Sequence, residues 1–174
     1  VSIEVLENGP VRGSVLVKRR FMDSVLEQMI CFYGHTARID FKTKVSWRQH
    51  QLLLRTAFPL DILCNEADYE IQFGSVRRPT HENTSWDRAR FEVCAHKWAD
   101  MAEPGYGAAL LNDCKYGYGI HDSVMSLTLI KSGIFPNPEA DQGLHEFTYS
   151  LFPHRGDFRE GGVVREAYRL NCPL

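Results

Sequence analysis

Histidines and carboxylates are the residues of this sequence from which hydrolytic chemistry would start. Seven histidines are present, but there is no H-E-x-x-H motif, and neither the His81 and His96 pair nor the His145 and His154 pair has a spacing typical of zinc ligands. Cleavage of a sugar bond with retention needs two carboxyl groups roughly 5–5.5 Å apart. The acidic residues are numerous, but their spacing predicts no converging pair, so we interpret both sets mainly as solvated or hydrogen-bonded side chains.

A set of aromatic and polar residues offers a different chemistry. Aromatic rings can lie against the C–H face of a pyranose, while amide, carboxylate and ammonium groups bind its hydroxyls. The set consists of Trp86, Trp98, Tyr106, Tyr116 and Tyr118, together with Asn112, Asp113 and Lys115. Aromatic residues at strand ends are also common at the rim of a hydrophobic core. A sugar-contacting surface and a core rim therefore both remain open as interpretations.

Motifs for nucleophilic catalysis and for phosphate binding are missing from the sequence. There is no G-x-S-x-G elbow. Cys114 precedes Lys115, whose charge would lower the pKa of the thiol, and a buried structural cysteine is the competing interpretation. The Gly-Tyr-Gly runs at 105–107 and 117–119 do not belong to a strand-to-helix G-x-G-x-x-G motif, so we predict that both are turns.

The composition is that of an ordinary globular protein with reduced thiols. The 174 residues carry a net charge of -2 and are 44% hydrophobic, which gives no electrostatic reason to expect nucleic acid or a membrane surface as partner. Five cysteines, an odd number without C-x-x-C, predict a cytoplasmic protein. No apolar run approaches the roughly 20 residues of a membrane span. The strand-like alternation from Val1 to Leu6 leads us to expect a piece of a longer protein.

The elements that would position such a site are predicted to be mainly β-strands. From Arg38 to Trp47 apolar and polar residues alternate strictly, with Ile39 to Trp47 at every second position on one face and Asp40 among the residues on the other. Such alternation predicts a half-buried strand of an antiparallel sheet. Further strands are predicted at residues 14–21, 24–33, 52–59, 67–73, 90–93, 107–111, 123–130 and 145–152. Their spacing favours a sandwich over alternating strands and helices.

Two other segments depart from the strand pattern. Residues 74–87 have little periodicity and are predicted to be a long loop. Val163, Val164, Ala167 and Tyr168 have helical spacing, which predicts one short helix near the carboxyl end. No linker divides the chain, so residues 1–174 are predicted to form a single mainly β domain, a large antiparallel β-sandwich.

Long stretches of the sequence resemble the α-mannosidases of glycoside hydrolase family 38, in the cytosolic and bacterial branch. The matching stretches cover nearly the whole chain and are residues 38–41, 47–54, 67–86, 89–100, 110–118, 138–143 and 145–151. The resemblance implies a sandwich of the galactose-mutarotase type. It also implies a parent enzyme that removes terminal α-linked mannose with retention. In the family, an amino-terminal catalytic domain holds one zinc ion and an Asp nucleophile. The residues here match only the later, carboxy-terminal β-sandwich region, so the zinc, the catalytic residues and the metal ligands are expected outside this chain.

The resemblance also suggests substrate contacts. In the family a few residues of the β domain reach the sugar pocket, and the matching zone here is the loop from Asn112 to Tyr118 and the strand that ends at Lys131. We therefore take Asn112, Asp113, Tyr116 and Lys131 as candidate substrate-binding residues. The family commonly ends this strand with Arg, and it often has Asp where Gly119 stands. Lys131 replaces a planar guanidinium by a point charge.

Three functions remain in competition at this stage. The first is a supporting, sugar-contacting and inactive piece of a zinc-dependent α-mannosidase, with the missing catalytic domain and mannosides as partners and a homo-oligomeric parent as a candidate assembly. The second is an autonomous carbohydrate-binding module that uses the aromatic set. The third is an aldose epimerase, which would need a His and a Glu that converge on a concave face.

Overall fold

The computed structural model describes residues 1–173, and these residues form two compact units. Unit 1 comprises Val1–Leu54 and Ile130–Ser150. Unit 2 comprises Arg55–Leu129 and the segment from Leu151 onward. Each unit is thus built from two separate stretches of sequence. Within residues 1–173 no helix has the length and apolar character that crossing a membrane requires.

The secondary structure is mainly antiparallel strand with one helix of more than two turns. The elements are β1 (Ser2–Asn8), β2 (Arg12–Phe21), β3 (Ser24–Tyr33), β4 (Thr36–Trp47), β5 (Leu54–Pro59), β6 (Glu66–Ile71), β7 (Gly74–Pro79), α1 (Ser85–Ala89), β8 (Val93–Cys94), β9 (Trp98–Glu103), β10 (Tyr106–Asn112), β11 (Gly117–His121), β12 (Val124–Ile130), β13 (Gly143–His154) and α2 (Val163–Asn171). The prediction of a mainly β, antiparallel chain with a short helix near its end is confirmed.

Unit 1 is a meander of β1 to β4, followed in the sheet by β13. The hairpin of β2 and β3 turns through two residues, because Phe21 pairs with Ser24, and Met22 in this turn has a φ of 50°. Cys31, Val45, Trp47, Phe147 and Tyr149 are buried in this unit. The rings of Phe41 and Tyr149 stack with their centroids 5.0 Å apart.

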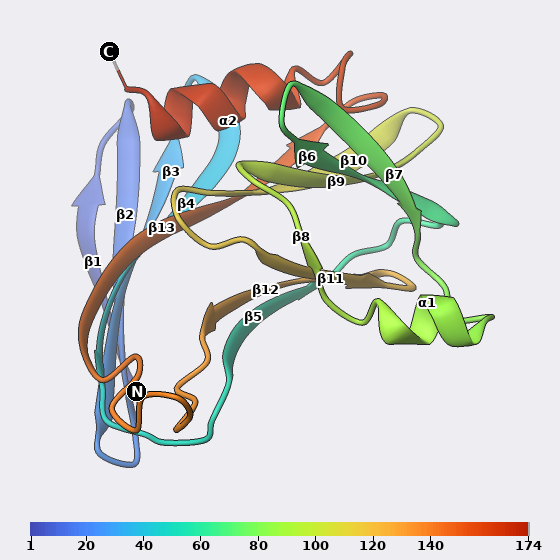
Figure 1. Cartoon of the computed structure of the whole chain (residues 1–174). Helices are drawn as coiled ribbons and strands as arrows, with labels where there is room; N and C mark the ends of the chain where they lie inside the picture. The colour runs from blue at the N-terminus through green and yellow to red at the C-terminus, as the bar shows by residue number, and fades with distance from the viewer. Residues whose placement is uncertain (174) are drawn as a thin grey trace. The chain divides into compact units, whose positions relative to one another are not determined.

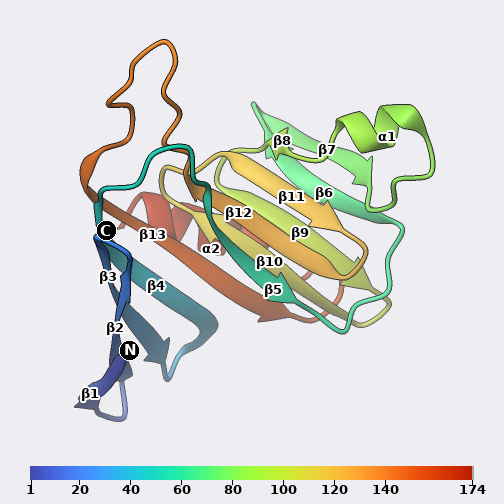
Figure 2. The same cartoon turned by 90° about the horizontal axis from the view of Figure 1, so that it is seen from below.

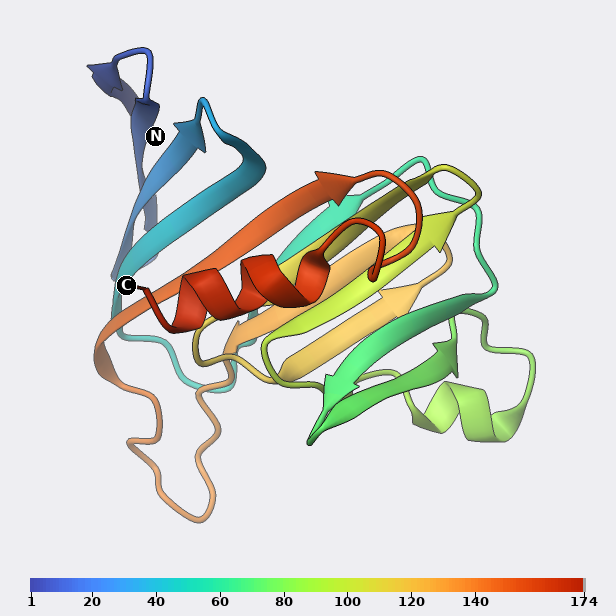
Figure 3. The same cartoon turned by 90° about the horizontal axis from the view of Figure 1, so that it is seen from above.

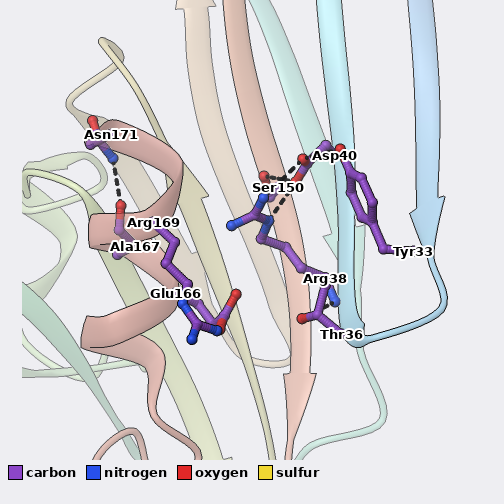
Figure 4. Close-up of polar contacts among 9 residues, drawn as sticks. All are labelled: Tyr33, Thr36, Arg38, Asp40, Ser150, Glu166, Ala167, Arg169 and Asn171. Atoms are coloured by element: carbon purple, nitrogen blue, oxygen red, sulfur yellow. Dashed lines mark hydrogen bonds and ion pairs between the residues drawn. The ribbon is translucent and has the colours of Figure 1, made fainter. Parts of the chain in front are cut away.

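One expectation for β4 is wrong. Asp40 was placed on the solvent face, but it is 2% exposed. Its carboxylate accepts hydrogen bonds from the Arg38 guanidinium (2.8 Å), the Tyr33 hydroxyl (2.8 Å) and the Ser150 hydroxyl (2.7 Å) (Figure 4). A buried carboxylate is tolerated only when it is paired and hydrogen-bonded, and these three partners meet that requirement. Period-two alternation cannot reveal this, because two of the partners lie on other strands.

Unit 2 is a two-layered sandwich. One layer contains β10, β9, β6 and β7 in that order, and the other contains β5, β12, β11 and β8. In Figure 1 these layers lie one above the other, and Figure 2 shows β5, β12 and β11 side by side in the second layer. Side chains from both layers fill the interior: Ala99, Met101, Ala108 and Leu110 from the first, and Tyr118, Ile120, Met125 and Leu127 from the second.

The helix α2 covers the outer face of the first layer (Figure 3). Val163 and Ala167 of α2 pack with Trp98, Ala109 and Leu111 in one buried cluster. Full burial of a Val or Leu side chain contributes about 1.5–3 kcal/mol, so this cluster holds the helix firmly. The β10 strand is consequently buried on both faces, which explains why its sequence is continuously apolar instead of alternating.

Some predicted boundaries are also wrong. Residues 74–87 are not a structureless loop, since β7 pairs with β6 and a capping box between Thr84 and Asp87 begins α1. The run at 117–119 is part of β11, because Gly117 and Gly119 pair with β12. The strand predicted at 90–93 is reduced to the short β8 at Val93–Cys94. These strands contain glycines and polar residues, so they lack the alternation of apolar and polar residues that predicts a strand. They form because neighbouring strands supply their hydrogen bonds.

We expect Asp40→Ala to lower the free energy of unfolding by about 3 kcal/mol, because it removes the buried carboxylate that pairs with the Arg38 guanidinium, whose side chain is only 14% exposed. The matched control is Glu146→Ala, which removes a solvent-exposed ion pair with Lys44 and should change stability little. Urea denaturation of both variants provides the measurement. A loss for Asp40→Ala no larger than that of the control would contradict the assigned network.

Candidate functional site

Two of the four candidate sugar contacts, Asp113 and Tyr116, lie in the loop that joins β10 to β11, and a third, Asn112 at the end of β10, fixes the position of this loop. The side-chain nitrogen of Asn112 donates to the His96 carbonyl oxygen (2.8 Å) and to the Tyr118 hydroxyl. Its side-chain oxygen accepts from the Lys115 amide (2.6 Å). Asn112 is 1% exposed. The amide is therefore used within the protein, and it shapes the loop from beneath.

The backbone of Asn112 is tied down as well. Its N–H donates to the Lys97 carbonyl at 3.0 Å. Its carbonyl accepts from the side chain of Asn171 at 2.9 Å, and Asn171 also bonds to the Ala167 carbonyl (Figure 4). The last turn of α2 thereby holds the end of β10. Burial raises the pKa of Tyr118, whose hydroxyl also donates to the Leu110 carbonyl.

The rest of the loop is more open. Tyr116 is half exposed, and its ring meets the His96 ring edge-on at 6.1 Å. Asp113 is partly buried beside Cys114. The thiol of Cys114 is not activated as Lys115 suggested, because burial and the neighbouring Asp113 raise its pKa to about 11. Cys114 is therefore a poor nucleophile at neutral pH.

Lys131, the fourth candidate, directly follows β12 and is exposed. It belongs to unit 1, whereas Asn112, Asp113 and Tyr116 belong to unit 2. The next residue, Ser132, is buried and bonds to the Leu52 carbonyl at 2.7 Å and to the Asp141 carboxylate through its amide at 3.0 Å. The backbone around Lys131 is thus anchored, and its side chain points to solvent. A sugar-binding role for the four residues stays a prediction.

The aromatic set singled out from the sequence does not share one surface. Trp98 and Tyr118 are almost fully buried in the core. Trp86, Tyr116 and Tyr106 are exposed on different elements: α1, the β10–β11 loop and the start of β10. Two members of the set therefore satisfy the core interpretation. Gly119, expected near the pocket, lies under the Arg55 guanidinium, which a Cβ at this position would approach to 2.6 Å.

A buried ion pair in unit 2 was not foreseen. His154 Nε2 lies 2.7 Å from the Asp100 carboxylate, and both side chains are 2% exposed. His154 Nδ1 lies 3.3 Å from the Arg155 carbonyl, so both ring nitrogens face acceptors, as in a protonated imidazole. Burial alone would lower the pKa of His154, but the hydrogen bond and charge of Asp100 outweigh it and raise the pKa.

Two glycines make room for this imidazole ring. A Cβ on Gly107 would come within 2.4 Å of His154 Cε1, and one on Gly161 within 2.4 Å of His154 Nδ1. No local pattern in the sequence indicated the pair, because Asp100 and His154 are 54 residues apart. Within residues 1–173 the His154 ring bonds only to the Asp100 carboxylate and the Arg155 carbonyl and to no hydroxyl or thiol nucleophile, so the pair is structural.

No three metal-ligating side chains of the His, Cys, Asp and Glu types come together anywhere in residues 1–173. A zinc ion of the kind implied by the sequence resemblance therefore has no ligand set in this part of the chain. No reaction step can be assigned to it here.

Comparison with known proteins gives the family. Residues 1–139 match the model described as glycosyl hydrolases family 38 C-terminal domain. The chain is 45% identical over 174 residues to human alpha-mannosidase 2C1, covering 99% of this chain and 17% of that protein. It is 46% identical to Dictyostelium discoideum alpha-mannosidase G, with 97% and 16% covered. The chain belongs to glycosyl hydrolase family 38, whose related members are α-mannosidases.

Solved structures support the fold. An α-mannosidase from Enterococcus faecalis superimposes with a TM-score of 0.85 at 18% identity, covering 96% of this chain and 23% of that one. A yeast alpha-mannosidase is 47% identical over 136 residues, 78% of this chain and 12% of that protein. The chain thus spans about one sixth of the length of the curated relatives that it matches along nearly all of its length.

Asn112→Ala should lower the free energy of unfolding by about 2 kcal/mol, because buried groups that lose a hydrogen-bond partner each cost about 1–3 kcal/mol. Asn83→Ala, at an exposed position before α1, serves as the matched control and should be nearly neutral. Chemical denaturation measures both. Equal, small losses would show that Asn112 does not hold the loop.

The His154 pair predicts a pH dependence of stability. A group whose pKa is higher in the folded protein stabilises it fully below the unfolded value of 6.5, and this contribution is lost as pH rises through the folded pKa. The stability difference between wild type and His154→Gln should therefore be largest near about pH 6 and shrink towards alkaline pH. Urea midpoints across this range measure it. A constant difference for His154→Gln across this pH range would contradict the prediction.

Proposed function

We propose that this chain is the C-terminal β-sandwich portion of a retaining, zinc-dependent α-mannosidase that hydrolyses terminal α-linked mannose. The observation that carries the proposal is the identity of about 45% with α-mannosidases along nearly the whole chain. The family supplies the reaction class, and the chain spans only 16–17% of those relatives. The catalytic carboxylates and the zinc ligands are therefore assigned to polypeptide outside this chain.

The role of this portion in the parent enzyme is structural and sugar-contacting. A rigid two-layered sandwich can hold loops in place against a neighbouring active site. Asn112 supports the β10–β11 loop through bonds to His96, Tyr118 and Lys115. Tyr116 and Lys131 offer an exposed ring and an exposed ammonium group. We assign Asp113, Tyr116 and Lys131 to contacts with the mannoside, and Asn112 to holding the loop.

The parent enzyme is proposed to work in the cytoplasm. Cys31, Cys64, Cys94, Cys114 and Cys172 are all free thiols in the structure. Free thiols on the surface are typical of a reducing compartment. Mannosides and the catalytic domain are the proposed partners.

The decisive assay compares the chain with the longer enzyme on a chromogenic α-mannoside, each with and without added zinc. The longer enzyme should turn over and lose activity with a chelator, while folded chain 1–174 should show no turnover, because residues 1–173 bring no set of three metal-ligating side chains together. Circular dichroism confirms that the chain is folded. Zinc-dependent turnover by the chain alone would refute the proposal.

An autonomous carbohydrate-binding module is the second candidate, favoured only by the exposed rings of Tyr116 and Trp86. Calorimetric titration of the same chain with mannose and manno-oligosaccharides separates the two. We expect no heat of binding. Specific binding that disappears in Tyr116→Ala would favour the module instead.

A further inference from the structure

The outer face of the second layer in unit 2 contains an area without large side chains of its own. On β11, Tyr118 points into the sandwich, so Gly117 and Gly119 face outward, because successive residues of a strand alternate between its two faces. Thr128 and Ser126 of β12 pair with these glycines and share their face. We call these four small residues the glycine floor. In Figure 2, β5, β12 and β11 lie in front of β9 and β10, so the floor faces the viewer.

Two side chains of opposite charge lie over the glycine floor. A Cβ on Gly117 would collide with the Glu92 carboxylate, and one on Gly119 would come within 2.6 Å of the Arg55 guanidinium. Gly117 and Gly119 are alternate residues of one strand, so they are about 7 Å apart. Glu92 and Arg55 form no ion pair with each other. Mutual neutralisation therefore does not explain why both charges lie on this face.

The polar groups around the glycine floor have unused hydrogen-bonding capacity. Within residues 1–173 the Glu92 carboxylate takes part in no hydrogen bond or ion pair. The Thr128 hydroxyl oxygen is buried and also lacks a hydrogen-bond partner in this part of the chain. The Arg55 guanidinium donates one bond, to Ser126 Oγ at 2.7 Å, although a guanidinium has five N–H donors. Buried polar groups are normally bonded, so this cluster calls for a partner.

A neutral sugar satisfies this combination of groups better than an ion does. Each sugar hydroxyl both donates and accepts, so two neighbouring hydroxyls can donate to a carboxylate while a third oxygen accepts from a guanidinium. An anion would be repelled by Glu92, and a cation would be repelled by Arg55. The glycines carry no Cβ, which lets a ligand approach the backbone closely, here with the C–H face of a pyranose ring. The glycine floor therefore fits one pyranose residue.

We propose that the glycine floor is the subsite for the sugar residue to which the terminal mannose is attached. Glu92 accepts hydrogen bonds from two of its hydroxyls, and Arg55 donates to a third oxygen. The floor is continuous with the candidate loop, because Tyr116, assigned above to contact the mannoside, directly precedes Gly117. The inference rests on the proposed function, since that function supplies the terminal mannose.

The subsite is expected to be weak by itself. Hydrogen bonds at an exposed face replace bonds to water, so their net contribution to binding is small. In the longer enzyme the terminal mannose is held elsewhere, which raises the effective concentration of the second sugar at the floor. Glu92 and Arg55 therefore act on disaccharides bound to the longer enzyme, and the isolated chain shows no heat of binding.

Removal of the carboxylate tests the subsite in the longer enzyme. The measured quantity is the ratio of kcat/KM for α-mannobiose to kcat/KM for a small chromogenic α-mannoside. Glu92→Ala should lower this ratio at least about tenfold, because only the disaccharide places a second sugar on the floor and loses a bond to a charged group. Glu146→Ala, at an exposed position on β13, is the matched control and should keep the ratio. An unchanged ratio in Glu92→Ala would overturn the proposal.

A methyl group on the glycine floor tests the same surface without removing a charge. The φ of Gly117 is not positive, so its backbone accepts Ala, and the new Cβ would displace the flexible end of Glu92. Gly117→Ala should keep the melting temperature of the longer enzyme and lower the same kinetic ratio. Gly74→Ala, where no described atom lies within 4 Å of an added Cβ, is the matched control and should change neither. A folded Gly117→Ala enzyme with an unchanged ratio contradicts the subsite.

The thiol of Cys94 reports directly whether the floor is occupied. Cys94 of β8 pairs with Gly117, so it shares the face of the floor, and it is exposed. Excess α-mannobiose should slow its alkylation by iodoacetamide in the longer enzyme, whereas methyl α-mannoside, which has no second sugar, should not. Alkylation of the exposed Cys172 serves as the reference rate. Equal protection of Cys94 by both sugars, or by neither, would overturn the proposal.

Turnover measured on the same preparation separates failure of the subsite from failure of the proposed function. Turnover of α-mannobiose without protection of Cys94, and with an unchanged ratio in Glu92→Ala, would refute the subsite alone. Protection of Cys94 by α-mannobiose without turnover of either substrate would support the floor as a sugar site and refute the proposed function.

Discussion

The burial of β10 on both of its faces is the constraint on which unit 2 depends. Ala109 and Leu111 face α2, while Ala108 and Leu110 face the other layer. Because neither face meets water, each position must be apolar or have its polar groups satisfied. The strand can only end where a polar side chain supplies the missing bonds. Asn112 does this, and the chain then turns into the loop that contains Tyr116.

The buried polar side chains discussed here bond to other groups of the protein and so stabilise the fold. The Asp100 and His154 pair has the chemical character of a catalytic carboxylate and imidazole, but both side chains are 2% exposed and two glycines close over the ring. A triad also needs a nucleophile within hydrogen-bond reach of the imidazole, and the second ring nitrogen faces the Arg155 carbonyl instead. Residue types that suggest catalysis in the sequence therefore act here as internal supports.

The features that could be predicted from the sequence are those that local periodicity or family resemblance indicates. The β4 strand, the helix at α2 and the antiparallel class follow from alternation and helical spacing. β7 and β11 could not be predicted in this way, because the glycines at Gly74, Gly117 and Gly119 interrupt any apolar alternation. These strands are defined by their pairing with β6 and β12. Period two also placed Asp40 in solvent, since its partner Ser150 is 110 residues away.

The sequence predicted the segment in which the candidate site lies, but not the role of each residue within it. Family resemblance pointed to the loop from Asn112 to Tyr118, and the structure gives its members different tasks. Asn112 and Tyr118 are interior supports, and Tyr116 is exposed. Spacing alone cannot make this distinction, because it depends on which neighbours accept each hydrogen bond.

The order of the chain interleaves the two compact units in sequence. The chain leaves unit 1 after Leu54 and returns at Ile130, so unit 1 gains its last strand only after nearly all of unit 2 has been made. The bond from Ser150 to Asp40 closes this long separation within unit 1. Contacts that are distant in sequence cost loop entropy before they contribute stability. Unit 1 therefore cannot be completed by a continuous segment of its own, and a cut anywhere between residues 55 and 129 would remove the covalent connection that brings β13 to β4.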